Sequence, residues 1–136
     1  MNYNALPYKE ARSAGAQVGR LFHSNLIGSG HSLGGGLSTT AALAGNYPTI
    51  NFNAAGLNPM VRYSLGLLNR NAPILEYSVP NEILSQIGNI TLAPSTDGKV
   101  LLLADPPDLS ASPITRHFMG SVITSLKYEL QQYHCQ

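Results

Sequence analysis

Gly28-Ser29-Gly30-His31-Ser32-Leu33-Gly34-Gly35-Gly36 is the stretch of sequence that decides the fold. Its middle fits the pattern Gly-x-Ser-x-Gly, in which a sharp turn between a strand and a helix presents a serine as nucleophile. The serine backbone comes so close to its neighbours that the positions two before and two after it must be very small. Gly30 and Gly34 meet that need. The pattern therefore predicts a nucleophile elbow at Ser32 and favours an esterase.

Two other interpretations of the glycine run fit the spacing less well. A dinucleotide-binding fingerprint needs a third glycine where this chain has Leu33, and a phosphate-binding loop needs Lys followed by Ser or Thr after its last glycine. A flexible turn would not lead into Leu37 and the alanines that follow it, which predict a helix of small residues able to pack tightly on a sheet.

Composition limits the classes of protein to consider. The 136 residues support one domain, with a net charge of +1 and only 11% charged residues. Because Lys and Arg form no cluster in the sequence, we expect no nucleic-acid partner. The longest apolar runs, such as Val100–Ala104, are too short for a transmembrane segment.

Targeting and redox signals are sparse. Met1–Pro7 lack the basic start and apolar stretch of a secretory signal, so we expect a cytosolic protein, an excised domain or the cargo of a signal-independent route. Cys135 is the single cysteine, which rules out an internal disulfide framework. The motifs imply neither a metal ion nor an organic cofactor.

Helical and strand patterns alternate along the chain, which is typical of an α/β layer structure. We expect a mostly parallel sheet with helices on both faces. The helices are predicted over Pro7–Phe22, from the elbow to a C-terminal cap at Gly45, from an N-cap at Asn58 to Asn69, and along the late stripe Phe118, Val122, Leu126 and Leu130. The strands are predicted at Leu26-Ile27, Thr49–Phe52 and Ile74–Ser78, with Ile90–Leu92 and Val100–Leu103 paired as a hairpin around Asp97-Gly98.

A serine hydroxyl is a poor nucleophile until a base takes its proton, so the elbow predicts an acid and then a histidine further along the chain. Glu82 is the best placed acid, because it follows a predicted strand closely. It could instead be a carboxylate that interacts with a helix N-terminus. Asp105 is the main competitor, whereas Glu76 lies within a strand and Asp97 within a turn.

His117 is the best candidate for the base, because it follows the acid and lies at the mouth of a late helix. Its alternative role is to cap or pack that helix. His31 neighbours the nucleophile but points elsewhere, where we expect it to pack or to form a hydrogen bond. His23 precedes the elbow and His134 lies in the C-terminal tail. The amide of Leu33, directly after the nucleophile, is expected to donate to the oxyanion.

Two strings, Gly30–Gly35 and Asn51–Gly56, resemble the elbow and the following strand of class 3 lipases in the α/β-hydrolase superfamily. The segment Asn81-Glu82-Ile83-Leu84 is similar to the one that carries the acid in that family, with Glu in place of Asp, and His117 matches the family's base. The resemblance covers roughly residues 7 to 130. It implies a serine hydrolase of apolar acyl esters, including glycerolipids or phospholipids.

Other functions stay open at this point. The same three side chains could act on a thioester, an amide or a small ester. The chain could also be the lipase-type toxin or effector domain of a longer protein, or an inactive fragment that acts in binding.

The main departure from the lipase pattern is at the N-terminus. Complete members of the superfamily have several strands before the elbow, together with a loop that supplies a second oxyanion donor. We therefore expect a partial hydrolase domain over residues 1–136, with an open sheet edge at the strand of Leu26 and Ile27. Such an edge predicts a homodimer or a partner segment that supplies the missing strands.

Overall fold

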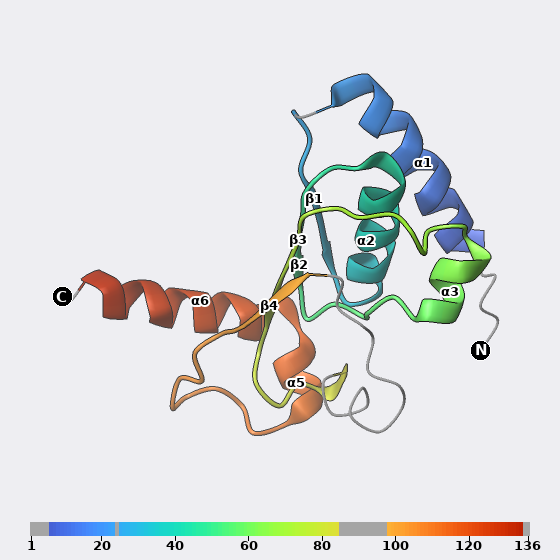
Figure 1. Cartoon of the computed structure of the whole chain (residues 1–136). Helices are drawn as coiled ribbons and strands as arrows, with labels where there is room; N and C mark the ends of the chain where they lie inside the picture. The colour runs from blue at the N-terminus through green and yellow to red at the C-terminus, as the bar shows by residue number, and fades with distance from the viewer. Residues whose placement is uncertain (1–5, 24, 85–97, 135–136) are drawn as a thin grey trace.

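A parallel sheet with helices on both faces forms the centre of the molecule (Figure 1). The computed structural model describes residues 6–23, 25–84 and 98–134. The four strands lie in the order β1-β2-β3-β4 and each neighbouring pair is parallel. Their bounds are Gly28–His31 for β1, Thr49–Phe52 for β2, Ile74–Ser78 for β3 and Lys99–Leu102 for β4. The α/β class expected from the sequence is confirmed.

The helices are divided between the two faces of the sheet. Figure 1 shows α1 (Leu6–Phe22), α2 (Leu33–Gly45) and α3 (Pro59–Ser64) on one side and α6 (Met119–His134) on the other. The short helix α5 (Pro113–His117) lies at the end of the sheet where the strands finish. Within the described ranges, no helix combines the length and the apolar character needed to cross a membrane.

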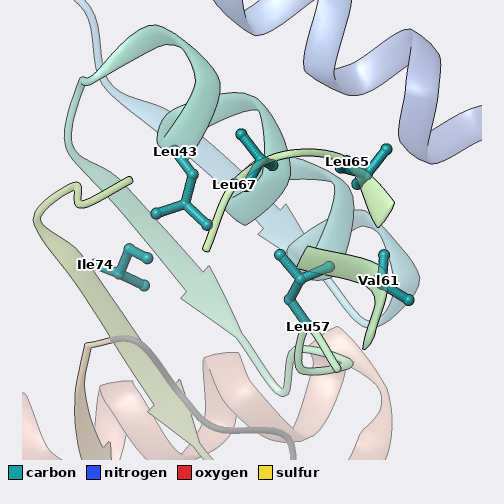
Figure 2. Packing of buried hydrophobic residues seen from close by; sticks show 6 residues of the cluster. All are labelled: Leu43, Leu57, Val61, Leu65, Leu67 and Ile74. Atoms are coloured by element: carbon teal, nitrogen blue, oxygen red, sulfur yellow. The ribbon is translucent and has the colours of Figure 1, made fainter. Parts of the chain in front are cut away.

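Each face of the sheet has its own apolar cluster. Residues from α2, α3, β3 and the neighbouring loops pack together on the first face (Figure 2). They are Leu43, Leu57, Val61, Leu65, Leu67 and Ile74. On the opposite face, Val122 of α6 packs with Val79 and Leu103, which directly follow β3 and β4. The two clusters hold the strand ends in place from both sides.

The first strand differs from the prediction. We expected a strand at Leu26-Ile27, but β1 begins at Gly28, and the side chain of Ile27 is 64% exposed. A Cβ on Gly28 would meet the side chains of Thr49 and Ser38, so α2 leaves little room for side chains above β1. Hydropathy therefore predicts the wrong residues for this strand, because β1 consists mainly of small residues that pack closely against α2.

Several element ends also differ from the prediction. The left-handed residue after α2 is Asn46, with φ 55°, and Gly45 is the last helical residue. Helix α3 begins as expected, with Asn58 as N-cap, but it ends at Ser64 well before Asn69. Phe118 precedes α6 and is exposed. These ends depend on backbone conformation, which the spacing of apolar residues in the sequence does not predict.

The fourth strand confirms one half of the predicted hairpin region. Lys99–Leu102 pairs in parallel with β3 and so occupies the outer position of the sheet. The expected partner strand Ile90–Leu92 and Asp97 of the predicted turn lie outside the described residues.

Helix α1 packs on α2 through glycines. A Cβ on Gly15 would collide with the carbonyl oxygen of Ala41, and a Cβ on Gly19 would collide with that of Gly45. The reverse also holds, because a Cβ on Gly45 would meet the carbonyl oxygen of Gly15. The two helices therefore touch backbone to backbone, which explains the small residue at position 45.

We predict that Gly15→Ala destabilises the fold, because the added methyl group cannot be placed without separating α1 from α2. The expected loss is about 1–3 kcal/mol in the free energy of unfolding, measured by urea denaturation. Gly120→Ala is the matched control, because it adds a methyl group to helix α6 where nothing lies within 4 Å. That variant is expected to gain up to about 1 kcal/mol. Equal stability of the two variants would contradict this account of the contact.

Candidate active site

Ser32 lies at the sharp turn between β1 and α2 that the sequence predicted. Its backbone has φ 55° and ψ −126°, a conformation that costs a residue with a side chain on the order of 1–3 kcal/mol. The carbonyl oxygen of Ser32 accepts hydrogen bonds from the amide of Gly35 at 2.9 Å and from that of Ala55 at 2.8 Å. The strained turn is thus fixed by both α2 and the loop after β2.

The glycines around Ser32 are needed at different positions from those expected. A Cβ on Gly30 would collide with the carbonyl oxygen of Gly34, so the prediction for Gly30 holds. A Cβ on Gly34 itself would meet nothing within 4 Å, which contradicts the expectation that Gly34 must be small. The confined positions in α2 are Gly35, where a Cβ would collide with Ala54, and Gly36, where it would meet the carbonyl oxygen of Ala55. The close approach is therefore between α2 and the loop that follows β2.

His117, the last residue of α5, is within hydrogen-bond distance of both predicted partners. Its Nε2 lies 2.7 Å from Oγ of Ser32, and its Nδ1 lies 2.7 Å from Oε2 of Glu82. An ionised carboxylate can only accept, so the neutral imidazole carries its proton on Nδ1 and donates it to Glu82. Nε2 is then left to accept the proton of the Ser32 hydroxyl. The three side chains form one continuous chain of hydrogen bonds.

Glu82 lies in the loop after β3 and its side chain is almost completely buried, with 2% exposed. The same carboxylate oxygen, Oε2, also accepts from the backbone amide of Leu84 at 2.9 Å. Glu82 therefore contacts both His117 and a backbone amide of the segment after it. These two hydrogen bonds fix the orientation of the carboxylate.

The other candidate acids lie elsewhere. Asp105 accepts from Nη1 of Arg116 at 2.9 Å in a partly exposed ion pair. Oε1 of Glu76 accepts from the backbone amide of Ala54 at 3.2 Å. Asp97 is outside the described residues. Of the carboxylates weighed from the sequence, the structure brings Glu82 to His117.

The remaining histidines agree with their sequence-based expectations. Nε2 of His31 lies 2.7 Å from the backbone carbonyl oxygen of His117, and the two rings are 5.1 Å apart. His31 therefore packs and forms a hydrogen bond beside the elbow, as expected. His23 directly follows α1, and His134 is the last residue of α6.

Sequence reasoning missed two buried polar residues at the site, Asn53 and Arg116. Nδ2 of Asn53 donates to the carbonyl oxygens of Arg116 at 3.0 Å and of His117 at 3.1 Å. The Arg116 guanidinium donates to the carbonyl oxygens of Pro80 at 3.0 Å and Ser110 at 2.6 Å, as well as to Asp105. One signal could have found Asn53, because it directly follows a strand whose carboxyl end lies beside the elbow.

The amide of Leu33 lies in the first turn of α2, where backbone N–H groups have no partner within the helix. Ser32 directly precedes α2, so the turn lies at the positive end of the helix dipole. The expected role of the Leu33 amide as an oxyanion donor stays a prediction. Among residues 6–23, 25–84 and 98–134, no group of three or more His, Cys, Asp or Glu side chains gathers in a way that could hold a metal ion.

Comparison with known proteins shows the family of this chain. Residues 1–104 match the phospholipase-like family described as the Tle-like phospholipase domain. The chain belongs to this family. It is also 30% identical over 143 residues to the extracellular phospholipase A1 of Serratia liquefaciens. That alignment covers 91% of this chain and 45% of the relative, so the chain spans about half of the relative's length.

The predicted lipase-like family is thus confirmed as a phospholipase-like family. Assignment to class 3 lipases or to the α/β-hydrolase superfamily stays a prediction.

Glu76 is a partly buried carboxyl group in this phospholipase-like domain. It lies on the face of the sheet that α2 covers, paired in register with Asn51. The pKa of Glu76 is raised to about 6, chiefly because burial disfavours the charged form; the hydrogen bond from Ala54 lowers the pKa and the negative charge of Glu82 raises it. Between the ordinary pKa of 4.5 and about 6 the folded state therefore binds more protons than the unfolded state. The contribution of Glu76 to the free energy of unfolding falls as the pH rises through this window.

We predict that Glu76→Gln is more stable than the wild type at pH 8, by about 1 kcal/mol. The amide keeps an oxygen for the backbone of Ala54 and removes the buried charge. At pH 4 the wild-type carboxyl group is protonated in both states, so the difference between the two proteins should become small. Thermal unfolding of the two proteins at pH 8 and at pH 4 measures both differences in stability. A wild type more stable than the variant at pH 8 would mean that the charged carboxylate is stabilised.

Proposed function

We propose that this phospholipase-like domain hydrolyses carboxylic esters of phospholipids through Ser32, His117 and Glu82. The single observation that carries the proposal is the unbroken chain of hydrogen bonds from the Glu82 carboxylate through the His117 imidazole to the Ser32 hydroxyl. Each side chain comes from a different segment, and the backbone of Ser32 has a strained conformation with φ 55°. Such strain is concentrated at functional sites.

The first half of the reaction forms an acyl-enzyme. Oγ of Ser32 attacks the ester carbonyl carbon while Nε2 of His117 takes the hydroxyl proton. Glu82 holds the imidazole in the correct tautomer and stabilises the imidazolium that forms. The amide of Leu33 donates to the oxyanion of the tetrahedral intermediate. When this intermediate collapses, His117 gives its proton to the leaving alcohol oxygen and the acyl group stays on Ser32.

The second half regenerates the serine. A water molecule takes the place of the alcohol, His117 removes its proton, and the resulting hydroxide equivalent attacks the acyl carbon. Collapse of the second intermediate returns the proton from His117 to Oγ of Ser32 and releases the carboxylic acid. Both halves use the same two hydrogen bonds of His117, so no side chain has to move far.

The phospholipid substrate is inferred from the family. The matching family is phospholipase-like, and the relative from Serratia liquefaciens is named as an extracellular phospholipase A1. Resemblance to class 3 lipases points to the same class of ester. Because the chain spans about half of that relative, the position of the cleaved ester bond is best measured directly on a defined phospholipid.

We predict that Ser32→Ala abolishes phospholipid hydrolysis and labelling by a fluorophosphonate, because both need the serine oxygen. His117→Ala should lower kcat by about three orders of magnitude or more, since the serine loses its base. Release of fatty acid from phospholipid vesicles measures turnover, and circular dichroism checks the fold. Labelling that persists in Ser32→Ala would place the nucleophile on another residue.

A second pair of variants separates the two candidate acids. Glu82→Gln should lower kcat by roughly 10³–10⁴-fold, because the amide no longer holds the imidazole in the required tautomer. Asp105→Asn removes one carboxylate charge of an ion pair that is partly exposed, so the expected change in kcat is less than about threefold. The opposite ranking of the two variants would assign the acid role to Asp105.

A further inference from the structure

We propose that Asn53 is a positioning residue for this reaction, joining the peptide that carries the base to the segment that leads to the acid. The inference rests on the proposed function, because it assigns Asn53 a role in setting the geometry of Ser32, His117 and Glu82. Asn53 touches none of the reacting atoms. It acts through the backbone of its neighbours.

Both ends of the Asn53 side chain are used. Nδ2 donates to the carbonyl oxygens of Arg116 and His117 at 3.0 and 3.1 Å. Oδ1 accepts from the amide of Val79 at 2.8 Å, three residues before Glu82. The side chain is only 1% exposed. A single buried amide thus connects the end of β2 to the peptide of the base and to the segment that carries the acid.

The backbone of Asn53 is anchored in the sheet. Its amide donates to the carbonyl oxygen of Tyr77 in β3 at 2.9 Å, which continues the ladder between β2 and β3 past the last paired residue. The side chain therefore extends from a fixed point, and the two segments that it binds take their positions from the sheet.

Few residue types could replace Asn53. Its φ of 41° is in the left-handed region, which asparagine tolerates better than most residues with a side chain. The contacts also require one group that donates and one that accepts at opposite corners of a planar side chain. Aspartate would tolerate the backbone, but it would place a negative oxygen against two carbonyl oxygens. Glycine would tolerate the backbone and lose every side-chain contact.

His117 needs this support because both of its ring contacts are short. The imidazole must reach Ser32 and Glu82 at once, each at 2.7 Å. A shift of the His117 peptide by about 1 Å would lengthen one of these contacts, and misplacement of that size costs on the order of 100-fold in rate. His31 also supports this peptide, because its Nε2 contacts the same carbonyl oxygen of His117. Removal of Asn53 is therefore expected to weaken the geometry without abolishing it.

The test compares Asn53→Gly with Asn51→Ala. Asn51 is the matched control because it lies two residues before Asn53, in β2, and is also 1% exposed, but its Nδ2 donates to Thr39 of α2 at 3.0 Å. We expect Asn53→Gly to lower kcat on phospholipid vesicles by about 10- to 100-fold with KM changed less than twofold. Asn51→Ala should lose stability and keep kcat within about twofold. Asn53→Asp, which keeps the shape of the side chain, replaces the glycine variant if that variant does not fold.

A spectroscopic measurement tells positioning from general loosening. In the wild type, the Nδ1 proton of His117 in its short bond to Glu82 should give a downfield proton resonance, and Asn53→Gly should weaken or shift it. Equal kcat in the Asn53 and Asn51 variants would overturn the role of Asn53. A lower kcat with an unchanged resonance would overturn it as well.

Ser32→Ala distinguishes the two possible failures. If Ser32→Ala is inactive and Asn53→Gly turns over at the wild-type rate, the role of Asn53 alone is wrong. If turnover survives in Ser32→Ala, the proposed function is wrong and the role of Asn53 is lost with it.

Discussion

The arrangement of the site depends on how closely three pieces of backbone approach one another at Ser32. The chain leaves β1, turns at Ser32 with a positive φ and returns as α2 directly above the strand. A Cβ on Gly30 or Gly35 would collide with backbone or with Ala54, so the turn can form only where those side chains are missing. The loop after β2 completes the contact by donating from Ala55 to the Ser32 carbonyl oxygen. These backbone contacts thereby fix the turn that carries the Ser32 hydroxyl.

Parallel pairing then brings the other groups to the same edge of the sheet. Because all four strands run in one direction, each ends beside the turn at Ser32. The end of β2 supplies Asn53, the segment after β3 supplies Glu82, and the connection after β4 leads to His117. Neighbouring strands thus contribute residues to the site in their order along the chain, and residues far apart in sequence meet at one edge of the sheet.

The order of residues along the chain was enough to predict which three side chains the structure brings together. Ser32, Glu82 and His117 followed from a turn motif and from the expected sequence of nucleophile, acid and base, and β2 and β3 have the predicted bounds. What sequence reasoning missed depends on contacts between distant segments. The start of β1 is determined by how closely α2 packs, and the contact of Asp105 with Arg116 was not foreseen. Asn53 contacts the peptide of His117, which lies 64 residues further along the chain.

The contacts around Glu82 fit the role of the acid in the proposed reaction. The buried cation nearest to His117 in sequence is Arg116, and its guanidinium is directed at Asp105 and at backbone carbonyl oxygens. Glu82 accepts from a backbone amide and contacts Nδ1 of His117. In the proposed reaction His117 becomes charged when it takes the serine proton, and a carboxylate already in contact with Nδ1 then stabilises the imidazolium. The carboxylate and the imidazole are in place before the charge develops, so this stabilisation requires no rearrangement of the two side chains.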